Sequence, residues 1–275
     1  MRHVFPRLAL LAAGALSCLS AQAHRPWLLP STTLADGQAP VVGIDAAISE
    51  DLFEFDSFPL ALDTLRVTAP DGSAVAPDAR IEARRRVSFD LKLEQKGTYR
   101  IAGVTDTVMV SWKAGGETKR WRGAPAALAR EVPADAPDLQ VTRQLARAET
   151  FVSNETPGTP AAAISGEGLE LQPLTSPTDL SVGDTSRFRV LLDGKPYPNA
   201  DVTLVRGGNR YRYKLGELAL KTDAAGELSV AWPEAGRWWM GISHGGRGPG
   251  AAAPVPGGAP VRRESYSATF EVLPK

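Results

Sequence analysis

The sequence predicts an all-β protein made of two β-sandwich domains, and three observations support this. Short stretches alternate apolar and polar residues with a period of two, which is typical of strands with one buried face. Gly, Pro and Asp residues that form turns separate these stretches at regular intervals, which indicates a sandwich. Finally, 275 residues are enough for two domains of modest size.

The first 23 residues have the three parts of a cleavable signal peptide. Arg2 and Arg7 give a basic start, an apolar stretch follows over 8–19, and Ala21-Gln22-Ala23 forms the cleavage motif. We therefore expect cleavage after Ala23 and export to the periplasm. The apolar stretch is shorter than the roughly 20 residues that a membrane-spanning helix needs, so we expect no direct membrane anchor.

Cleavage would leave 252 residues with no cysteine, because Cys18 is the only one in the chain. Lipidation of Cys18 is the alternative form of processing. The processed chain would carry 29 basic and 31 acidic residues, a formal net charge of −2. Such a balance gives no electrostatic reason to expect nucleic acid as a partner. Only two histidines would remain, His24 and His244.

Residues 24–122 are expected to form the N-terminal β-sandwich. Alternation over 87–94 predicts a strand, and Lys96-Gly97 would turn the chain into a second strand at 98–101, forming a hairpin. A further hairpin is predicted between the strands that end at Trp112 and at Trp121.

Residues 123–166 are rich in Ala and Pro, and we interpret them as a connector. The segment 138–151 is its one helical candidate, although the apolar residues there are only weakly periodic. A strand over 149–152 is the alternative.

Residues 167–275 are expected to form the C-terminal sandwich. Trp238, Met240, Ile242 and His244 would share one face of a strand. The loop at 245–260 is so rich in Gly and Pro that we expect it to be flexible.

Several motifs together resemble the exported family known as domain of unknown function 4198. They are His24-x-x-Trp27-Leu28, Gly168-Leu169-Glu170-Leu171, Asp193-Gly194-Lys195-Pro196, Thr222-Asp223-x-x-Gly226 and Glu264-Ser265-Tyr266. That family is described as a periplasmic component of nickel or cobalt uptake. The resemblance implies transition-metal binding, and an immunoglobulin-like or prealbumin-like module in the C-terminal half.

Cleavage after Ala23 would place His24 at the mature N-terminus, where its α-amine and ring Nδ1 can chelate one metal ion. One more imidazole, from His244, would complete three nitrogen donors, a set that suits Cu(II) or Ni(II). We therefore predict one divalent nickel, cobalt or copper ion at His24 and His244, with Glu264 as a weaker candidate ligand. The alternatives are His24 binding metal alone, and His244 as a residue at the edge of the core.

The leading functional hypothesis is a periplasmic metal-binding accessory protein for uptake or delivery, whose partner would be a membrane transporter or an outer-membrane receptor. A non-metal envelope module that docks on a receptor, transporter or glycan is the alternative. A copper oxygenase with an N-terminal histidine is a third hypothesis. The sequence has no Ser-His-Asp arrangement, paired carboxylates or phosphate-binding glycine motif, so we do not expect an enzyme.

Overall fold

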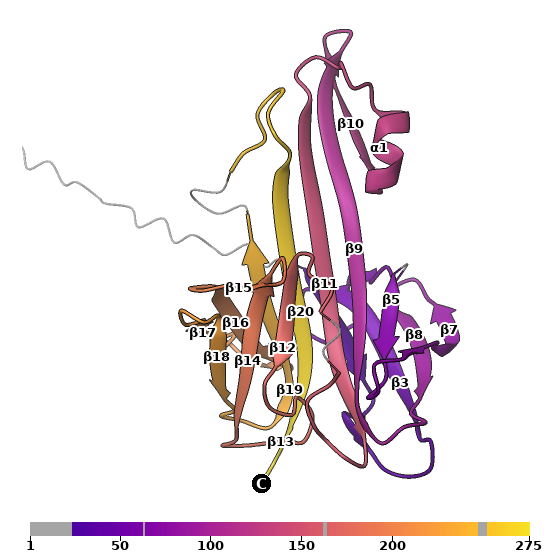
Figure 1. Cartoon of the computed structure of the whole chain (residues 1–275), viewed down its shortest axis with the longest axis vertical. Coiled ribbons are helices and arrows are strands. Elements are labelled where there is room, and N and C mark those ends of the chain that lie inside the picture. The colour runs from indigo at the N-terminus through magenta and orange to yellow at the C-terminus, as the bar shows by residue number, and fades with distance from the viewer. Residues whose placement is uncertain (1–23, 63, 162–163, 247–251) are drawn as a thin grey trace, which may run out of the picture.

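The computed structural model describes residues 24–62, 64–161, 164–246 and 252–275, so the predicted signal peptide lies outside the described residues. The protein is all-β, with one large sheet and two smaller sheets (Figure 1). A single short helix, α1 (Pro125–Glu131), and the 3₁₀ turn η1 (Asn209–Tyr211) complete the described elements. Over these residues, no helix is both long and apolar enough to cross a membrane.

The first small sheet belongs to the N-terminal half and has the strand order β1-β3-β8-β7, with β4 beside β3. Its strands are β1 (Arg25–Pro30), β3 (Val41–Ser49), β4 (Phe58–Pro59), β7 (Asp78–Glu82) and β8 (Val87–Lys92). The alternation in β8 is realised as predicted, because Val87, Phe89 and Leu91 are all buried.

The large sheet draws strands from both halves of the chain, in the order β17-β16-β19-β20-β11-β9-β5-β6. These strands are β5 (Leu65–Thr68), β6 (Ala74–Val75), β9 (Gly97–Ala114), β11 (Gln140–Asn154), β16 (Asp201–Arg206), β17 (Leu218–Lys221), β19 (Gly236–His244) and β20 (Val261–Leu273). Three further strands pair at its margins: β2 (Leu34–Ala35), β10 (Glu117–Gly123) and β13 (Leu180–Ser181).

The second small sheet belongs to the C-terminal half and centres on β14. It contains β12 (Leu169–Pro173), β14 (Thr185–Leu192), β15 (Lys195–Pro196) and β18 (Glu227–Ala231).

The two small sheets pack on opposite faces of the large one, and β11 contributes to both cores. Its Ala148 and Val152 join the N-terminal core, together with Phe89 of β8, whereas Phe151 joins the C-terminal core with Phe270 of β20. Successive residues of a strand point to opposite faces, so a single strand can serve both cores.

Two expectations about the N-terminal half and the connector need correction. The strands at 87–94 and 98–101 do not form a hairpin, because β8 pairs with β3 and β7 while β9 pairs with β11, β10 and β5. The chain changes sheets between them. The segment 123–166 contains α1 and the 15-residue strand β11, which lies inside the large sheet, so the segment is not a simple connector. The helical candidate at 138–151 falls mostly within β11 and is not helical. The β9–β10 hairpin forms as predicted, with Trp121 opposite Val110.

The predicted flexible loop falls partly outside the described residues. Its described residues, 245–246 and 252–260, form no helix or strand, and the Gly257 N–H donates a hydrogen bond to the Leu139 carbonyl at 2.8 Å.

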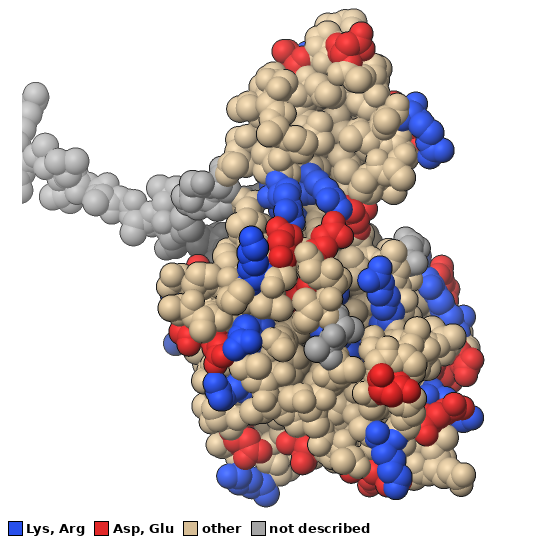
Figure 2. Space-filling model, viewed as in Figure 1, with Lys and Arg blue, Asp and Glu red and all other residues tan. Residues whose placement is uncertain are grey.

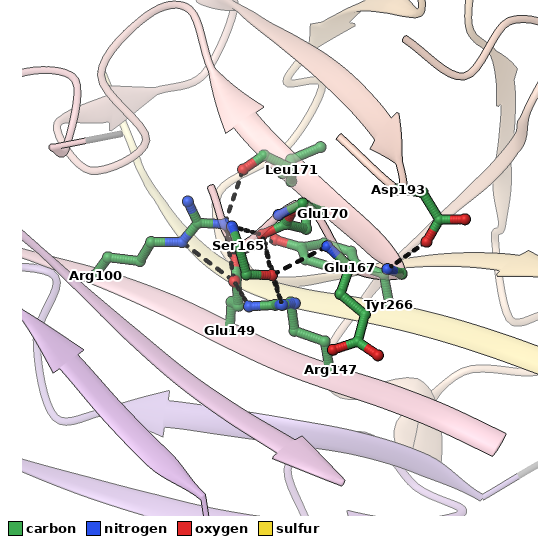
Figure 3. A network of polar contacts seen from close by, with 11 residues as sticks. Arg100, Arg147, Glu149, Ser165, Glu167, Glu170, Leu171, Asp193 and Tyr266 are labelled. Atoms are coloured by element: carbon green, nitrogen blue, oxygen red, sulfur yellow. Dashed lines mark hydrogen bonds and ion pairs between the residues drawn. The ribbon is translucent and has the colours of Figure 1, made fainter. Parts of the chain in front are cut away.

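A buried ionic network fixes the second small sheet to the large one (Figure 3). Arg100 of β9 donates to the Glu149 carboxylate of β11 from Nε at 3.1 Å and from Nη2 at 2.8 Å, and Nη2 also donates to the Leu171 carbonyl of β12 at 3.0 Å. Tyr266 of β20 donates to the same carboxylate at 2.7 Å. Because Arg100 and Glu149 are both buried, each depends on the other for charge compensation.

Acidic and basic side chains are intermingled over the face of the molecule seen in Figure 2. Many of them form ion pairs; Arg143, for example, lies 2.6 Å from Asp106 and 2.7 Å from Glu167. This face therefore presents a mixture of charges rather than a field of one sign.

Candidate functional site

A groove opens where the long strands of the large sheet extend past the first small sheet. Its volume is about 590 Å³, and we call it the His24 groove after the residue at its N-terminal margin. Arg25, Thr107, Arg122, Trp239 and Ser265 are among the other residues that line it. Pockets of this size ordinarily accommodate small molecules.

Short polar side chains from four strands of the large sheet lie on the floor of the groove, with β11 between the last two: Thr203 from β16, Ser243 from β19, Ser265 and Ser267 from β20, and Thr105 and Thr107 from β9. This is the face of the large sheet that carries the N-terminal core further along the same strands. Hydroxyl groups both donate and accept hydrogen bonds, so the floor can bind a polar molecule in several orientations.

The register of β1 places His24 opposite Glu50. Arg25 pairs with Ser49 in the antiparallel β1–β3 ladder, so the residues just beyond that pair, His24 and Glu50, face each other. His24 Nε2 lies 3.6 Å from Glu50 Oε1, and its ring lies beside Phe58 with centroids 5.7 Å apart. With Nε2 turned to the carboxylate, Nδ1 is the ring nitrogen that a terminal α-amine can join in a chelate.

The start of β1 is attached to the large sheet by two hydrogen bonds to one carbonyl. Trp239 Nε1 and Ser267 Oγ each donate to the Pro26 oxygen at 2.9 Å. The Arg25 guanidinium lies 5.6 Å from the centre of the Trp239 ring and pairs with Glu217 at 3.2 Å. These contacts hold Arg25 and Pro26, the two residues that follow His24, in fixed positions on the wall of the groove.

His244 lies on the other face of the large sheet. Met240 and Ile242, which share its face of β19, belong to the C-terminal core, whereas Trp239 and Ser243 face the groove that His24 lines. The structure therefore does not bring His24 and His244 together, and His244 is not a third nitrogen donor for a metal held at His24. Among the described residues, no group of three or more His, Cys, Asp or Glu side chains could hold a metal ion.

His244 and Glu264 do lie together, as Cα partners in the β19–β20 ladder. His244 Nδ1 is hydrogen-bonded to Tyr197 Oη at 2.9 Å, and the two rings meet edge to face. Glu264 is only 4% exposed, and its carboxylate forms an ion pair with Arg262. Burial raises its pKa, although the nearby Arg262 guanidinium acts in the opposite direction.

Arg262 also holds Asp193 in a two-pronged ion pair, with both hydrogen bonds at 2.9 Å. This pairing lowers the pKa of the Asp193 carboxyl to about 2. The Asp193 carboxylate is thus already neutralised by Arg262, and the surroundings of His244 are those of a hydrogen-bonded residue at the edge of the core.

Sequence reasoning identified His24 but missed Glu50, Arg122 and the hydroxyl-bearing floor. The alternating Ser and Thr residues of β9 and β20 were the available signal. Alternation shows that these residues share a face of the large sheet. It does not show that the first small sheet leaves this part of the face uncovered.

Comparison with solved structures finds similar chains at low identity. The D0-D1 domain of intimin is 14% identical, with 89% of this chain and 97% of that chain covered and a TM-score of 0.23. A DUF4785 family protein from Legionella pneumophila is 10% identical, with 78% and 50% covered and a TM-score of 0.24. TM-scores this low do not indicate a function for this chain. A search of curated proteins finds no match.

The chain also matches a family model. The family described as "Domain of unknown function (DUF4198)" matches residues 21–246, which is most of the chain. The chain therefore belongs to the DUF4198 family.

Proposed function

We propose that this protein is an exported carrier of a transition-metal ion, which it binds at the N-terminus formed by cleavage after Ala23. The observation that supports this most is the position of His24. Its imidazole lines a groove of about 590 Å³, and its Nε2 faces the Glu50 carboxylate at 3.6 Å.

The donors at His24 suit nickel or copper. After cleavage, the α-amine and Nδ1 of His24 would supply two nitrogens from one residue, and imidazole and amine nitrogens are preferred ligands of Cu(II) and Ni(II). The Glu50 carboxylate next to Nε2 resembles the outer partners that orient metal-binding histidines and make them more basic. The metal is cargo in this proposal, to be passed to a transporter or receptor of the cell envelope.

The test is a calorimetric titration of Ni(II) and Cu(II) into protein that begins at His24. We expect one binding site per chain. Glu50→Gln should weaken binding about tenfold, because the histidine loses the carboxylate that orients it.

Two changes separate the two nitrogens of the chelate. His24→Ala removes the imidazole, whereas acetylation of the N-terminus of the processed protein blocks the α-amine and leaves the imidazole in place, and we expect each change to abolish tight binding. His244→Ala is the matched control, since it also removes an imidazole but on the opposite face of the large sheet. Equal loss in the control, or no binding by the processed wild type, would contradict the proposal.

A further inference from the structure

The His24 groove is much larger than a bare metal ion requires. Nitrogen ligands lie about 2.0–2.1 Å from a transition metal, so an ion held by protein side chains needs little space beyond its donors. The groove has about 590 Å³, within the range of about 300–1,000 Å³ that small-molecule sites occupy. Its size therefore fits an ion together with an organic molecule.

The carboxylates that line the groove already have partners. Glu217 is paired with Arg25 at 3.2 Å, and Asp201 is paired with Lys221. A metal ion on the two nitrogens of His24 would thus have further coordination positions for a molecule that arrives with it. Tetragonal Ni(II) and Cu(II) bind four or more donors, so at least two would come from elsewhere.

The walls of the groove offer partners for carboxylate and hydroxyl oxygens. Arg122 of β10 brings a guanidinium, and the hydroxyls of Thr107 and Ser265 lie on β9 and β20, on either side of β11. Guanidinium groups bind carboxylates through paired hydrogen bonds.

We propose that the His24 groove binds its metal as a complex with a small hydroxycarboxylate chelator, with His24 as the protein ligand and Arg122 and the hydroxyl-bearing floor binding the chelator. This inference rests on the proposed metal-binding function and specifies the form in which the metal is bound. The protein would then contact both the metal and its chelator, so it would bind the complex more tightly than it binds the bare ion or the free carboxylate.

Native mass spectrometry of the processed protein can detect such an assembly directly. Protein that begins at His24 would be mixed with Ni(II) alone, with the Ni(II)–citrate complex, or with the Ni(II)–ethylenediamine complex. We expect one nickel and one citrate per chain in the second mixture. Ethylenediamine also chelates nickel but has no oxygen for Arg122, so its complex should bind at least tenfold more weakly than the citrate complex.

Arg122→Gln tests the wall of the groove without touching the metal donors. It should weaken binding of Ni(II)–citrate about tenfold and leave binding of free Ni(II) unchanged. Arg84→Gln is the matched control, since it makes the same change at an exposed position between β7 and β8, and should alter neither affinity.

The outcomes distinguish this inference from the proposed function. If chains carry nickel without citrate, and citrate only removes the metal by competition, the chelator inference is wrong and metal binding at His24 stands. If Arg122→Gln weakens binding of both nickel forms equally, Arg122 does not recognise the chelator, which also overturns the inference. If no nickel binds in any mixture, the proposed function itself fails.

Discussion

Glu264 shows how a buried carboxyl can make the stability of this protein depend on pH. Glu264 is only 4% exposed, its carboxylate forms an ion pair with Arg262, and the other titratable groups near it are Asp193, His244 and Tyr197. Desolvation is the largest influence, so the pKa of Glu264 in the folded protein lies above its ordinary value of 4.5.

The sign of the pH effect follows from this shift. A carboxyl with a raised pKa keeps its proton in the folded protein while the unfolded chain releases it. The free energy of unfolding therefore receives the full contribution of Glu264 below about pH 4.5, and loses it as the pH rises through the raised pKa.

Glu264→Gln should remove this loss, because the amide cannot ionise. We expect the variant to gain stability relative to wild type as the pH rises from 4.5 to 8. Urea unfolding at several pH values measures the difference. Glu117→Gln, at an exposed carboxyl of β10, is the control, and a constant difference between Glu264→Gln and wild type across the range would contradict the prediction.

At the scale of elements, the attachment of β1 to β19 depends on a glycine. A Cβ built on Gly241 would lie 2.0 Å from the Trp239 ring, so only glycine lets that indole lie over the strand and donate its hydrogen bond to Pro26. The guanidinium of Arg25, the residue that follows His24, also lies over the Trp239 indole. The position of the proposed metal chelate thus depends on the absence of a side chain in a neighbouring strand.

Gly241→Ala should displace the Trp239 ring and loosen β1. We expect a loss of about 1–3 kcal/mol in the free energy of unfolding, as for other overpacked sites, together with weaker metal binding at His24. Gly43→Ala in β3 is the matched control, because its Cβ would meet only an ordinary contact at 3.5 Å. Thermal melts and nickel titrations measure both effects, and an unchanged melting temperature for Gly241→Ala would show that the ring can move freely.

At the scale of the whole molecule, the two sandwiches share one sheet. Strand β11 lies between β9 of the N-terminal half and β20 of the C-terminal half, and its side chains enter both cores. The Arg100–Glu149 pair adds a buried ionic link from β9 through β11 to β12. Neither half can therefore unfold without exposing apolar surface and ladder hydrogen bonds of the other.

We expect a single cooperative unfolding transition, with tryptophan fluorescence and circular dichroism changing together. Glu149→Gln should lower the stability of the whole molecule by about 3–5 kcal/mol, because Arg100 would remain buried without its counter-charge. A fragment of residues 24–122 should not fold, since it lacks β11. Two separate transitions, or a folded fragment, would show instead that the halves are independent.

The sequence by itself determined the local part of this structure and of its candidate site. Period-two alternation predicted strands, the β9–β10 hairpin was predicted between Trp112 and Trp121, and His24 was identified as the potential chelating residue. The shared face of Met240, Ile242 and His244 was also predicted from alternation. All of these depend on residues a few positions apart, whose relation the backbone geometry fixes directly.

Only the tertiary structure decided which strands pair and which faces meet. Alternation in β8 and β9 is the same whether they form a hairpin or lie in different sheets, and pairing with distant strands settled the matter. Likewise, alternation placed His244 on one face of β19, but the packing of β1 against Trp239 placed His24 on the other. Pairing between distant strands depends on the burial and hydrogen bonding of the whole sheet, which no local pattern contains.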